Sequence, residues 1–296
     1  MLSQKTDVVY VIATDREEGQ RLDNFLMRYL RDVPKTHIYR LIRKGEVRVN
    51  KKRAQQDTRL EQGDAIRIPP MHREPVEVPI TVLNDQQKSW VKDVVIAENE
   101  DFLVVNKPEN VSVHAGSDTR VGLIEALRIY REDLRFIELV HRIDRATSGL
   151  LLIAKKPAML KTLHALVRDR ELQKKYHLVV FGTWPKSLNK IDTPVEGRDS
   201  LTTFQIMKTF DGMTLLEANL HTGRQHQIRI HAASVGYPIV GDTKYGNFEK
   251  NREFAKKYKM DSMFLHAKHL KFSWNDEVLN FDAPYPEAWV ELLSLA

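Results

Sequence analysis

The chain has 296 residues, of which 42% are hydrophobic and 29% are charged, and its formal net charge is +6. This length and apolar content can supply a buried core for one large domain or two ordinary ones, so we do not expect a disordered chain. There is no cysteine, which excludes disulfides, cysteine-ligated zinc, iron–sulfur clusters and cysteine nucleophiles.

We expect a cytoplasmic protein without a membrane span. The apolar run at residues 8–13 is too short for a secretion-signal core, and charged residues follow it at once. No apolar run approaches the roughly 20 residues that a membrane-spanning helix needs. We also expect a monomer.

The positive charge is concentrated near the N-terminus. Residues 21–67 contain thirteen basic and six acidic residues, so this segment carries the whole positive excess. A solvated basic surface is the common reason for such a bias, but a module that binds a polyanion has the same signature. The concentration within one segment favours a polyanion-binding module.

The same segment has the pattern of a small module of two helices and short strands. Residues 21–30 carry apolar side chains at the spacing of a helix with one buried face, and a second helix is predicted from Thr36, as its N-cap, to Gly45. Strands are predicted at Val47–Val49 and around Ile66–Ile68, with a turn at Asn50–Lys51.

This module resembles the alpha-L RNA-binding domain in three stretches, RLDNFL, IYRLIRKGEVRVNKKR and LEQGDAIRI. The resemblance covers residues 20–69, within an N-terminal region that we place at residues 1–70. It implies phosphate contacts with strong salt dependence and little sequence preference. The residues expected to contact RNA are Arg21, Arg40, Arg43, Lys44, Lys51, Lys52 and Arg53. The alternative is a basic helical hairpin without a ligand.

Residues 71–92 are predicted to form a linker, because they contain Pro75, Pro79 and mostly polar residues. A second domain follows at residues 93–296. Its predicted elements are strands at Val94–Ala97 and Phe102–Asn106, a helix at Leu123–Tyr130, strands at Leu139–Val140 and Leu150–Ala154, a helix at Pro157–Val167, strands at Tyr176–Phe181 and Leu215–Leu220, and a helix ending at Gly236. Strands mixed with irregularly spaced helices favour an α+β domain with a mixed sheet.

Three polar strings interrupt the apolar runs of this domain, and sites are usually built at such interruptions. The first, HRIDRATSG at residues 141–149, places Asp144 in a loop between two buried strands, with Arg142 and Arg145 beside it. This aspartate would stay ionised at neutral pH and could attack an electrophile. For an arbitrary aspartate, a capping or salt-bridged role is the usual alternative.

The second string, Lys174–Tyr176, enters a strand, where a tyrosine is usually just a half-buried sheet residue. The third string runs from His221 to His231, and its three histidines suggest a metal site. However, His226 and His231 stand five residues apart, not four, and no glutamate motif accompanies them. We therefore expect neither a metal nor a cofactor.

Together these strings resemble the pseudouridine synthase family. HRIDRATSG resembles its aspartate motif, KKYHLVVFG its tyrosine motif and GRQHQIRIH its arginine motif, and NKP, GYPIVGDTKYG and FLHA appear in the family's order. The match covers nearly the whole chain. It implies a mixed, largely antiparallel central sheet and the isomerisation of uridine to pseudouridine in large-subunit ribosomal RNA, by base flipping and without a cofactor.

The resemblance assigns roles position by position. Asp144 falls on the family's catalytic aspartate, Tyr176 on its active-site tyrosine, and Arg229 on the arginine that pairs with the aspartate. Arg142 falls on the arginine that helps to displace or replace the flipped base. We also expect contacts to substrate or RNA from His141, Lys107 and Arg224.

The chain departs from the family's pattern at a few positions. Ile143 stands where leucine is usual, and Ala146 and Gln225 where a polar residue and threonine are common. Glu109–Asn110 replaces a small residue and glycine, but asparagine tolerates positive φ, so the turn can survive. None of these departures touches the expected chemistry.

Three alternatives remain open. A non-catalytic ribosome-assembly factor would keep the basic module but could lose the aspartate, whereas Asp144, Tyr176 and Arg229 are present together. A pseudouridine synthase acting on another structured RNA would have the same motifs. A metal-dependent hydrolase using the histidines would lose activity in excess chelator.

Overall fold

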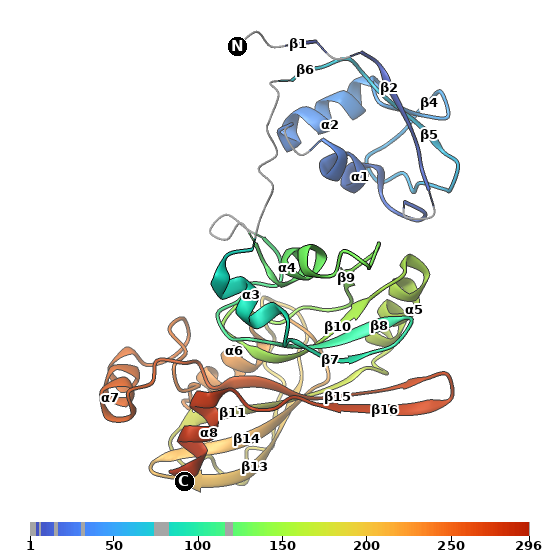
Figure 1. The fold of residues 1–296 in the computed structure, drawn as a ribbon. Helices are drawn as coiled ribbons and strands as arrows, with labels where there is room; N and C mark the ends of the chain where they lie inside the picture. The colour runs from blue at the N-terminus through green and yellow to red at the C-terminus, as the bar shows by residue number, and fades with distance from the viewer. Residues whose placement is uncertain are drawn as a thin grey trace. The chain divides into compact units, whose positions relative to one another are not determined.

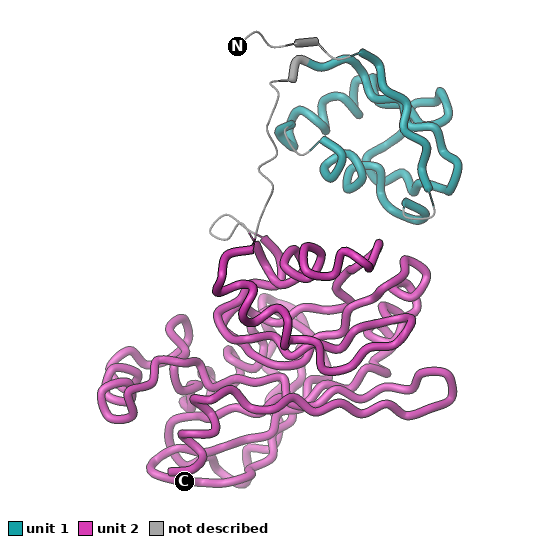
Figure 2. Tube along the Cα trace, viewed as in Figure 1, with its two compact units in different colours: residues 1–81 teal, residues 82–296 magenta. Residues whose placement is uncertain are grey.

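The chain folds into two compact units, residues 1–81 and residues 82–296 (Figure 2). The structure is a computed structural model that describes residues 4–5, 7–14, 17–30, 33–73, 83–115 and 121–295. Within the described part, no helix is both long and apolar enough to cross a membrane.

The first unit packs two helices against a small sheet (Figure 1). Its elements are β1 (Gln4–Lys5), β2 (Val9–Ile12), α1 (Leu22–Tyr29), α2 (Lys35–Lys44), β3 (Arg48–Val49), β4 (Lys52–Arg53), β5 (Ala65–Ile68) and β6 (His72–Arg73). Four strands form a sheet in the order β2-β5-β3-β4, and β1 pairs with β6. Leu22, Leu26, Ile38 and Ile66 are fully buried between the helices and this sheet.

Local chemistry explains the ends of these elements. α2 begins two residues before its predicted start, because the carbonyl of Pro34 already accepts the N–H of Ile38. Gly45 ends the helix in the left-handed conformation, as predicted. The predicted turn at Asn50–Lys51 is also present, with φ values of 50° and 66°.

The predicted linker differs from the structure at its C-terminal end. We placed that end at Lys92, whereas α3 (Asp85–Val91) belongs to the second unit and Val91 is fully buried in its core. The Asn84 side chain accepts the N–H of Gln87, and the Gln87 side chain accepts the N–H of Asn84, so a capping box starts this helix. The rest of the predicted linker, including both prolines, lies outside the described residues except for residues 71–73 and 83–84.

The second unit is built on a ten-stranded sheet, in the order β12-β13-β14-β11-β15-β10-β8-β7, with β16 paired to β15 and β9 to β10. Its strands are β7 (Val95–Glu98), β8 (Phe102–Lys107), β9 (Glu138–Leu139), β10 (Ser148–Ala154), β11 (Gln173–Phe181), β12 (Lys190–Ile191), β13 (Thr202–Phe210), β14 (Met213–Leu220), β15 (Leu265–Trp274) and β16 (Glu277–Asp282). Its other helices are α4 (Leu123–Tyr130), α5 (Pro157–Arg168), α6 (Gln227–Ser234), α7 (Phe248–Tyr258) and α8 (Glu287–Ser294).

The predicted α+β class with a mixed, largely antiparallel sheet is confirmed. Of the strand pairs assigned in the described part of this sheet, only β10 with β15 is parallel. The elements predicted for this unit are present, with their ends shifted by a few residues. β13, β15, β16, α7 and α8 were not predicted from the sequence.

The parallel pair depends on one glycine of the HRIDRATSG string. Gly149 has a φ of 110°, and a β-carbon placed there would lie 2.3 Å from the carbonyl oxygen of Ala267 on β15. Only glycine therefore permits the start of β10 to approach β15 this closely. β10, which contains this glycine, is buried over all of its seven residues.

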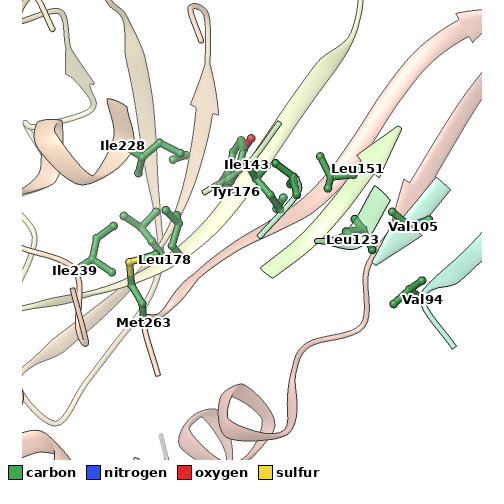
Figure 3. Packing of buried hydrophobic residues seen from close by; sticks show 14 of the residues in the cluster. Val94, Val105, Leu123, Ile143, Leu151, Tyr176, Leu178, Ile228, Ile239 and Met263 are labelled. Carbon is green, nitrogen blue, oxygen red and sulfur yellow. The ribbon is translucent and has the colours of Figure 1, made fainter. Parts of the chain in front are cut away.

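Loop 141–147 is anchored in the main core cluster of this unit. Ile143 and Tyr176 belong to that cluster together with Leu151 and Leu178, and Figure 3 shows these side chains in one layer along the sheet. The apolar residue in the middle of a polar string thus holds the loop against β11, while its polar neighbours remain near the surface.

We expect Gly149→Ala to lower the free energy of unfolding of the second unit by at least about 3 kcal/mol, because it adds a backbone clash to an unfavourable φ. Gly197 is the matched control: its φ is 70°, and no described atom lies within 4 Å of a β-carbon placed there. Gly197→Ala should lower stability by only about 1 kcal/mol. Urea unfolding followed by circular dichroism measures both, and equal losses would contradict the steric argument.

Candidate active site

The centre of the site is one arginine shared by two aspartates. Asp144 lies in loop 141–147, before β10, and Arg229 lies on α6. Arg229 Nη1 donates to Asp144 Oδ2 at 3.2 Å. Its Nε and Nη2 donate to the two carboxylate oxygens of Asp242, each at 2.8 Å. The predicted pairing of Asp144 with Arg229 is therefore present, and Asp242 holds the other side of the guanidinium.

The two carboxylates differ in burial. The side chain of Asp242 is 1% exposed and that of Asp144 is 19% exposed. Asp242 uses both oxygens on Arg229 in a bidentate pair, whereas Asp144 makes a single, longer contact. Asp242 thus has the geometry of a structural partner, and Asp144 has an oxygen left for a reacting group.

Electrostatics keep this centre charged. Burial by itself would lower the pKa of Arg229, but its hydrogen bonds to Asp242 and Asp144 raise it overall. Burial by itself would raise the pKa of Asp242, but Arg229 and the backbone N–H groups of Tyr245 and Lys244 lower it overall. The guanidinium therefore remains a cation beside Asp144 at neutral pH.

Asp242 was missed from the sequence, although it lies within GYPIVGDTKYG. The preceding Gly241 has a φ of 78°, and a β-carbon there would lie 1.9 Å from the carbonyl oxygen of Ser262. Asn251 on α7 accepts the N–H of Gly241 and donates to the carbonyl of Asp242, both at 2.9 Å. The sequence showed only an acidic residue after a glycine in this motif, because the constraint on Gly241 arises from its contact with Ser262.

His226 lies beside the same centre and has a different role from the metal ligand first considered. Its Nε2 is 3.7 Å from Asp144 Oδ2, and its Nδ1 is hydrogen-bonded to the Tyr245 hydroxyl at 2.9 Å. The Arg229 guanidinium lies 5.2 Å from the centre of the Tyr245 ring. Burial is the main reason that the pKa of His226 is lowered, so the imidazole is neutral at neutral pH.

Tyr176 lies on β11 within the main core cluster. It is buried, and this burial together with the nearby charge of Asp144 raises the pKa of its hydroxyl. The phenol is therefore neutral at physiological pH. Tyr176 presents a rigid ring beside the loop of Asp144, and Ile143 packs in the same cluster (Figure 3).

Lys107 differs from its predicted role in RNA contact. It is fully buried, and its ammonium donates to the carbonyls of Pro108, Val111 and Arg145 at 2.7, 2.8 and 3.0 Å. Burial lowers its pKa to about 7. All three contacts lie inside the protein, so Lys107 joins the segment after β8 to the Asp144 loop at Arg145.

The other predicted contacts fall into two groups. His141 accepts the N–H of Leu152 through Nε2 at 3.3 Å, and burial lowers its pKa well below the ordinary value, which is the environment of a packed side chain. Arg142 and Arg224 are exposed, and Arg224 Nε donates to the carbonyl of Asp199.

At the departure from the family pattern, Asn110 has a φ of 60°, so the turn is retained.

The basic residues predicted for the first unit are mostly at its surface. Arg40, Arg43, Lys44, Lys51, Lys52 and Arg53 are exposed. The side chain of Arg53 donates to the carbonyl of Arg43, so the end of α2 lies against β4. Arg21 is only partly exposed, and it forms a two-point ion pair with Asp23.

Two open hollows on the second unit lie elsewhere, one beside α3 and the end of α4 and one over β13 and β14. Neither is lined by Asp144, Tyr176 or Arg229. The Asp144 side chain is nevertheless 19% exposed, so solvent can reach it.

Comparisons with known proteins show which families the chain matches. Residues 101–234 match the family described as RNA pseudouridylate synthase, and residues 20–66 match the S4 domain family. The second match agrees with the RNA-binding domain predicted over residues 20–69.

Two relatives are similar over nearly the whole chain. Ribosomal large subunit pseudouridine synthase C of Vibrio parahaemolyticus is 41% identical over 298 residues, which cover 95% of this chain and 94% of the relative. The protein of the same name from Escherichia coli K12 is 40% identical over 306 residues, covering 97% and 96%. The sequence motifs also resemble those of synthase C, and these matches confirm the resemblance to pseudouridine synthases expected from the sequence.

Solved structures show the same fold. Human RNA pseudouridylate synthase domain containing 4 matches with a TM-score of 0.61 at 21% identity, over 71% of this chain and 96% of that chain. Human RNA pseudouridylate synthase domain containing 1 matches with a TM-score of 0.55 at 24% identity, over 68% and 85%.

We expect Asp242→Ala to lower the free energy of unfolding by about 3–5 kcal/mol at pH 7, because it leaves a buried guanidinium without its bidentate partner. Asp133→Ala is the control, since it removes an exposed partner of Arg131 and should change stability little. The pKa of Asp242 is lowered by folding, so the difference between wild type and variant is fully present above about pH 4 and shrinks as the pH falls through the folded-state pKa. Denaturant unfolding at several pH values measures this, and a pH-independent difference would refute it.

Proposed function

This chain belongs to the RNA pseudouridine synthase family, and on that premise we propose that it converts specific uridines of large-subunit ribosomal RNA to pseudouridine, with Asp144 as its catalytic residue. The observation that carries the assignment of Asp144 is its single contact with Arg229, which leaves a partly exposed carboxylate oxygen next to a buried cation. The substrate follows from the names of the relatives that match over nearly the whole chain. We place this reaction in the cytoplasm and expect a monomer.

The reaction needs no outside reagent. The bond between ribose carbon 1 and uracil nitrogen 1 breaks, the uracil turns while it stays bound, and carbon 1 bonds to uracil carbon 5. Carbon 5 loses a proton and nitrogen 1 gains one, so neither oxidation nor reduction occurs. Asp144 acts either as a nucleophile or as a base on the nucleoside, and both roles require the ionised form.

A uridine stacked in RNA cannot present these atoms, so we infer that it is flipped out of its stack into the site. Arg142 is exposed two residues before Asp144, and in this proposal it occupies the position that the flipped base leaves. Tyr176 supplies a buried, neutral ring against which the uracil can stack. Arg229 keeps a positive charge in contact with the Asp144 carboxylate while the base turns.

The first unit supplies affinity for RNA. Its exposed lysines and arginines suit contacts to phosphates, which hold RNA without reading its sequence. This role is compatible with the S4 domain match over residues 20–66. Selection of the uridine would then depend on the second unit and on the ease of flipping each nucleotide.

The catalytic assignment is tested in cells that lack this protein and are complemented with wild type, Asp144→Asn or the control Asp169→Asn. Asp169 is an exposed residue paired with Arg168, so its variant should behave as wild type. We expect Asp144→Asn to abolish pseudouridine at the target sites, mapped in ribosomal RNA, while the purified variant binds RNA within about threefold of wild type.

Turnover by Asp144→Asn at the wild-type rate would refute the role of Asp144. If ribosomal RNA kept its pseudouridines in cells without the protein while another structured RNA lost them, the substrate would be that other RNA. Full modification without the protein, combined with normal RNA binding, would favour a non-catalytic assembly factor.

The role of the first unit is tested by replacing Lys44, Lys51 and Lys52 with glutamine in the full chain. Each lost phosphate contact should reduce the slope of log Kd against log salt concentration by about 0.7–0.9. The maximal rate at saturating RNA should remain within about twofold of wild type, because the active site is untouched. Lys190→Gln, at a lysine paired with Asp192 on the second unit, is the control. An unchanged salt slope in the triple variant would contradict this division of labour.

A further inference from the structure

The sheet face opposite Tyr176 carries a second cluster of polar side chains. His177 follows Tyr176 on β11, Glu217 lies on the neighbouring β14, and His269 lies on β15 at the other side of β11 (Figure 1). Each offers one nitrogen or oxygen atom, and these three atoms all lie within 4.8 Å of one another. Because side chains alternate along a strand, this cluster and the active-site tyrosine face opposite ways.

The two imidazoles are oriented by partners at their outer nitrogen. His177 Nδ1 is hydrogen-bonded to the hydroxyl of Tyr285 at 2.5 Å. His269 Nδ1 contacts the carboxylate of Asp282. A histidine that binds a metal through one nitrogen almost always has the other nitrogen held by a carboxylate, carbonyl or similar group. Both rings therefore have Nε2 available for a ligand bond.

The inner nitrogen of His177 has no hydrogen-bond partner within the described part of the chain. The His177 side chain is 4% exposed, and its Nε2 lies 3.6 Å from Glu217 Oε2. That distance is too long for a good hydrogen bond, but it is close to the spacing of about 3.4 Å between two ligands of one tetrahedral zinc ion. A buried, unsatisfied nitrogen aimed at a carboxylate oxygen is the arrangement that a metal ion would complete.

The surrounding charges are compatible with a cation. Lys175 donates to Glu217 Oε1 at 2.7 Å, which leaves Oε2 facing His177. Lys268 donates to the carbonyl of Ala283 and lies 3.6 Å from Asp282. The two ammonium groups are thus balanced by two carboxylates.

We propose that His177, Glu217 and His269 bind one Zn²⁺ ion, with water as a fourth ligand, and that this ion is structural. Histidine nitrogens with one carboxylate are a typical zinc donor set. Glu217 also lines an open hollow of about 520 Å³ over β13 and β14, which provides a path for the ion. This inference is independent of the catalytic role of Asp144.

The ion would join three strands at an irregular point of the sheet. The register between β11 and β15 shifts at Lys175/Tyr176, so the pairing is least regular where Tyr176 enters the active site. A metal bound behind this point would stabilise the pairing of β11 with β14 and β15 at the bulge. We expected no metal from the spacing of the motif histidines, whereas these three residues come from separate strands and have no spacing signature along the chain.

The test is metal binding by the full-length protein, equilibrated with ZnCl₂ and dialysed. We expect one zinc per chain, a visible absorption spectrum of tetrahedral type when Co²⁺ is substituted, and a Tm that rises by on the order of 5 °C at a hundredfold excess over Kd. His269→Gln and Glu217→Gln should each weaken binding by more than about 100-fold. His164→Gln, at an exposed histidine on α5, is the matched control and should bind like wild type.

Wild type that retains no zinc and shows no rise in Tm would overturn the proposal, as would His269→Gln and Glu217→Gln variants that bind as tightly as His164→Gln. Circular dichroism of each variant without metal shows whether weakened binding reflects unfolding. Chelation should lower Tm while pseudouridine formation at moderate temperature stays within about twofold. Loss of that activity at full folding would refute the structural role of the ion, and would leave the assignment of Asp144 untouched.

Discussion

The site depends on the unequal division of one guanidinium between two carboxylates. Arg229 gives two hydrogen bonds to the buried Asp242 and one to the partly exposed Asp144. A buried arginine would be unfavourable without a partner, so Asp242 makes its burial possible. Asp242 holds Nε and Nη2 of the guanidinium. The remaining nitrogen, Nη1, can therefore contact Asp144 and leave its carboxylate partly exposed. The Asp144 carboxylate is thereby oriented by the guanidinium and still accessible.

The backbone supports this division at two glycines. Gly149 lets β10 run against β15 immediately after the Asp144 loop, and Gly241 lets the Asp242 turn pass against Ser262. Lys107 adds a third restraint, because its side chain joins the carbonyls of Pro108 and Val111, after β8, to that of Arg145 in the Asp144 loop. Such restraints fix the positions of charged groups before a substrate binds, which is how preorganised sites act on developing charge.

Strand β11 contributes side chains to both faces of the central sheet, and the two faces have different environments. On β11, Tyr176 faces the catalytic side and the main core, while His177 joins polar residues of β14 and β15 on the other side. The alternation of side chains along a strand separates the two environments by a single residue. Substitutions at adjacent positions of β11 are therefore expected to have unrelated consequences, one on the reaction and the other on stability.

Local sequence patterns were sufficient to predict much of this fold. The helical spacing in residues 21–30, the turn at Asn50–Lys51 and the buried strand of β10 depend on neighbours in the chain, and all are present in the structure. By contrast, β15 and β16 were not predicted. β15 buries His266 and carries Lys271 and other polar residues. The alternation of apolar and polar residues that would predict a strand is therefore hidden, because the burial of these side chains depends on distant strands.

The sequence by itself determined the family and the α+β class, and it indicated Asp144, Tyr176 and Arg229 as candidate site residues, because motif order and short-range periodicity are properties of the chain. Only the tertiary structure decided that Asp242 is the second partner of Arg229, that Lys107 is an internal clamp, and that His177, Glu217 and His269 converge. These relations join residues far apart in the chain. Burial and distance arise only when strands and loops pack, so no local pattern could have contained them.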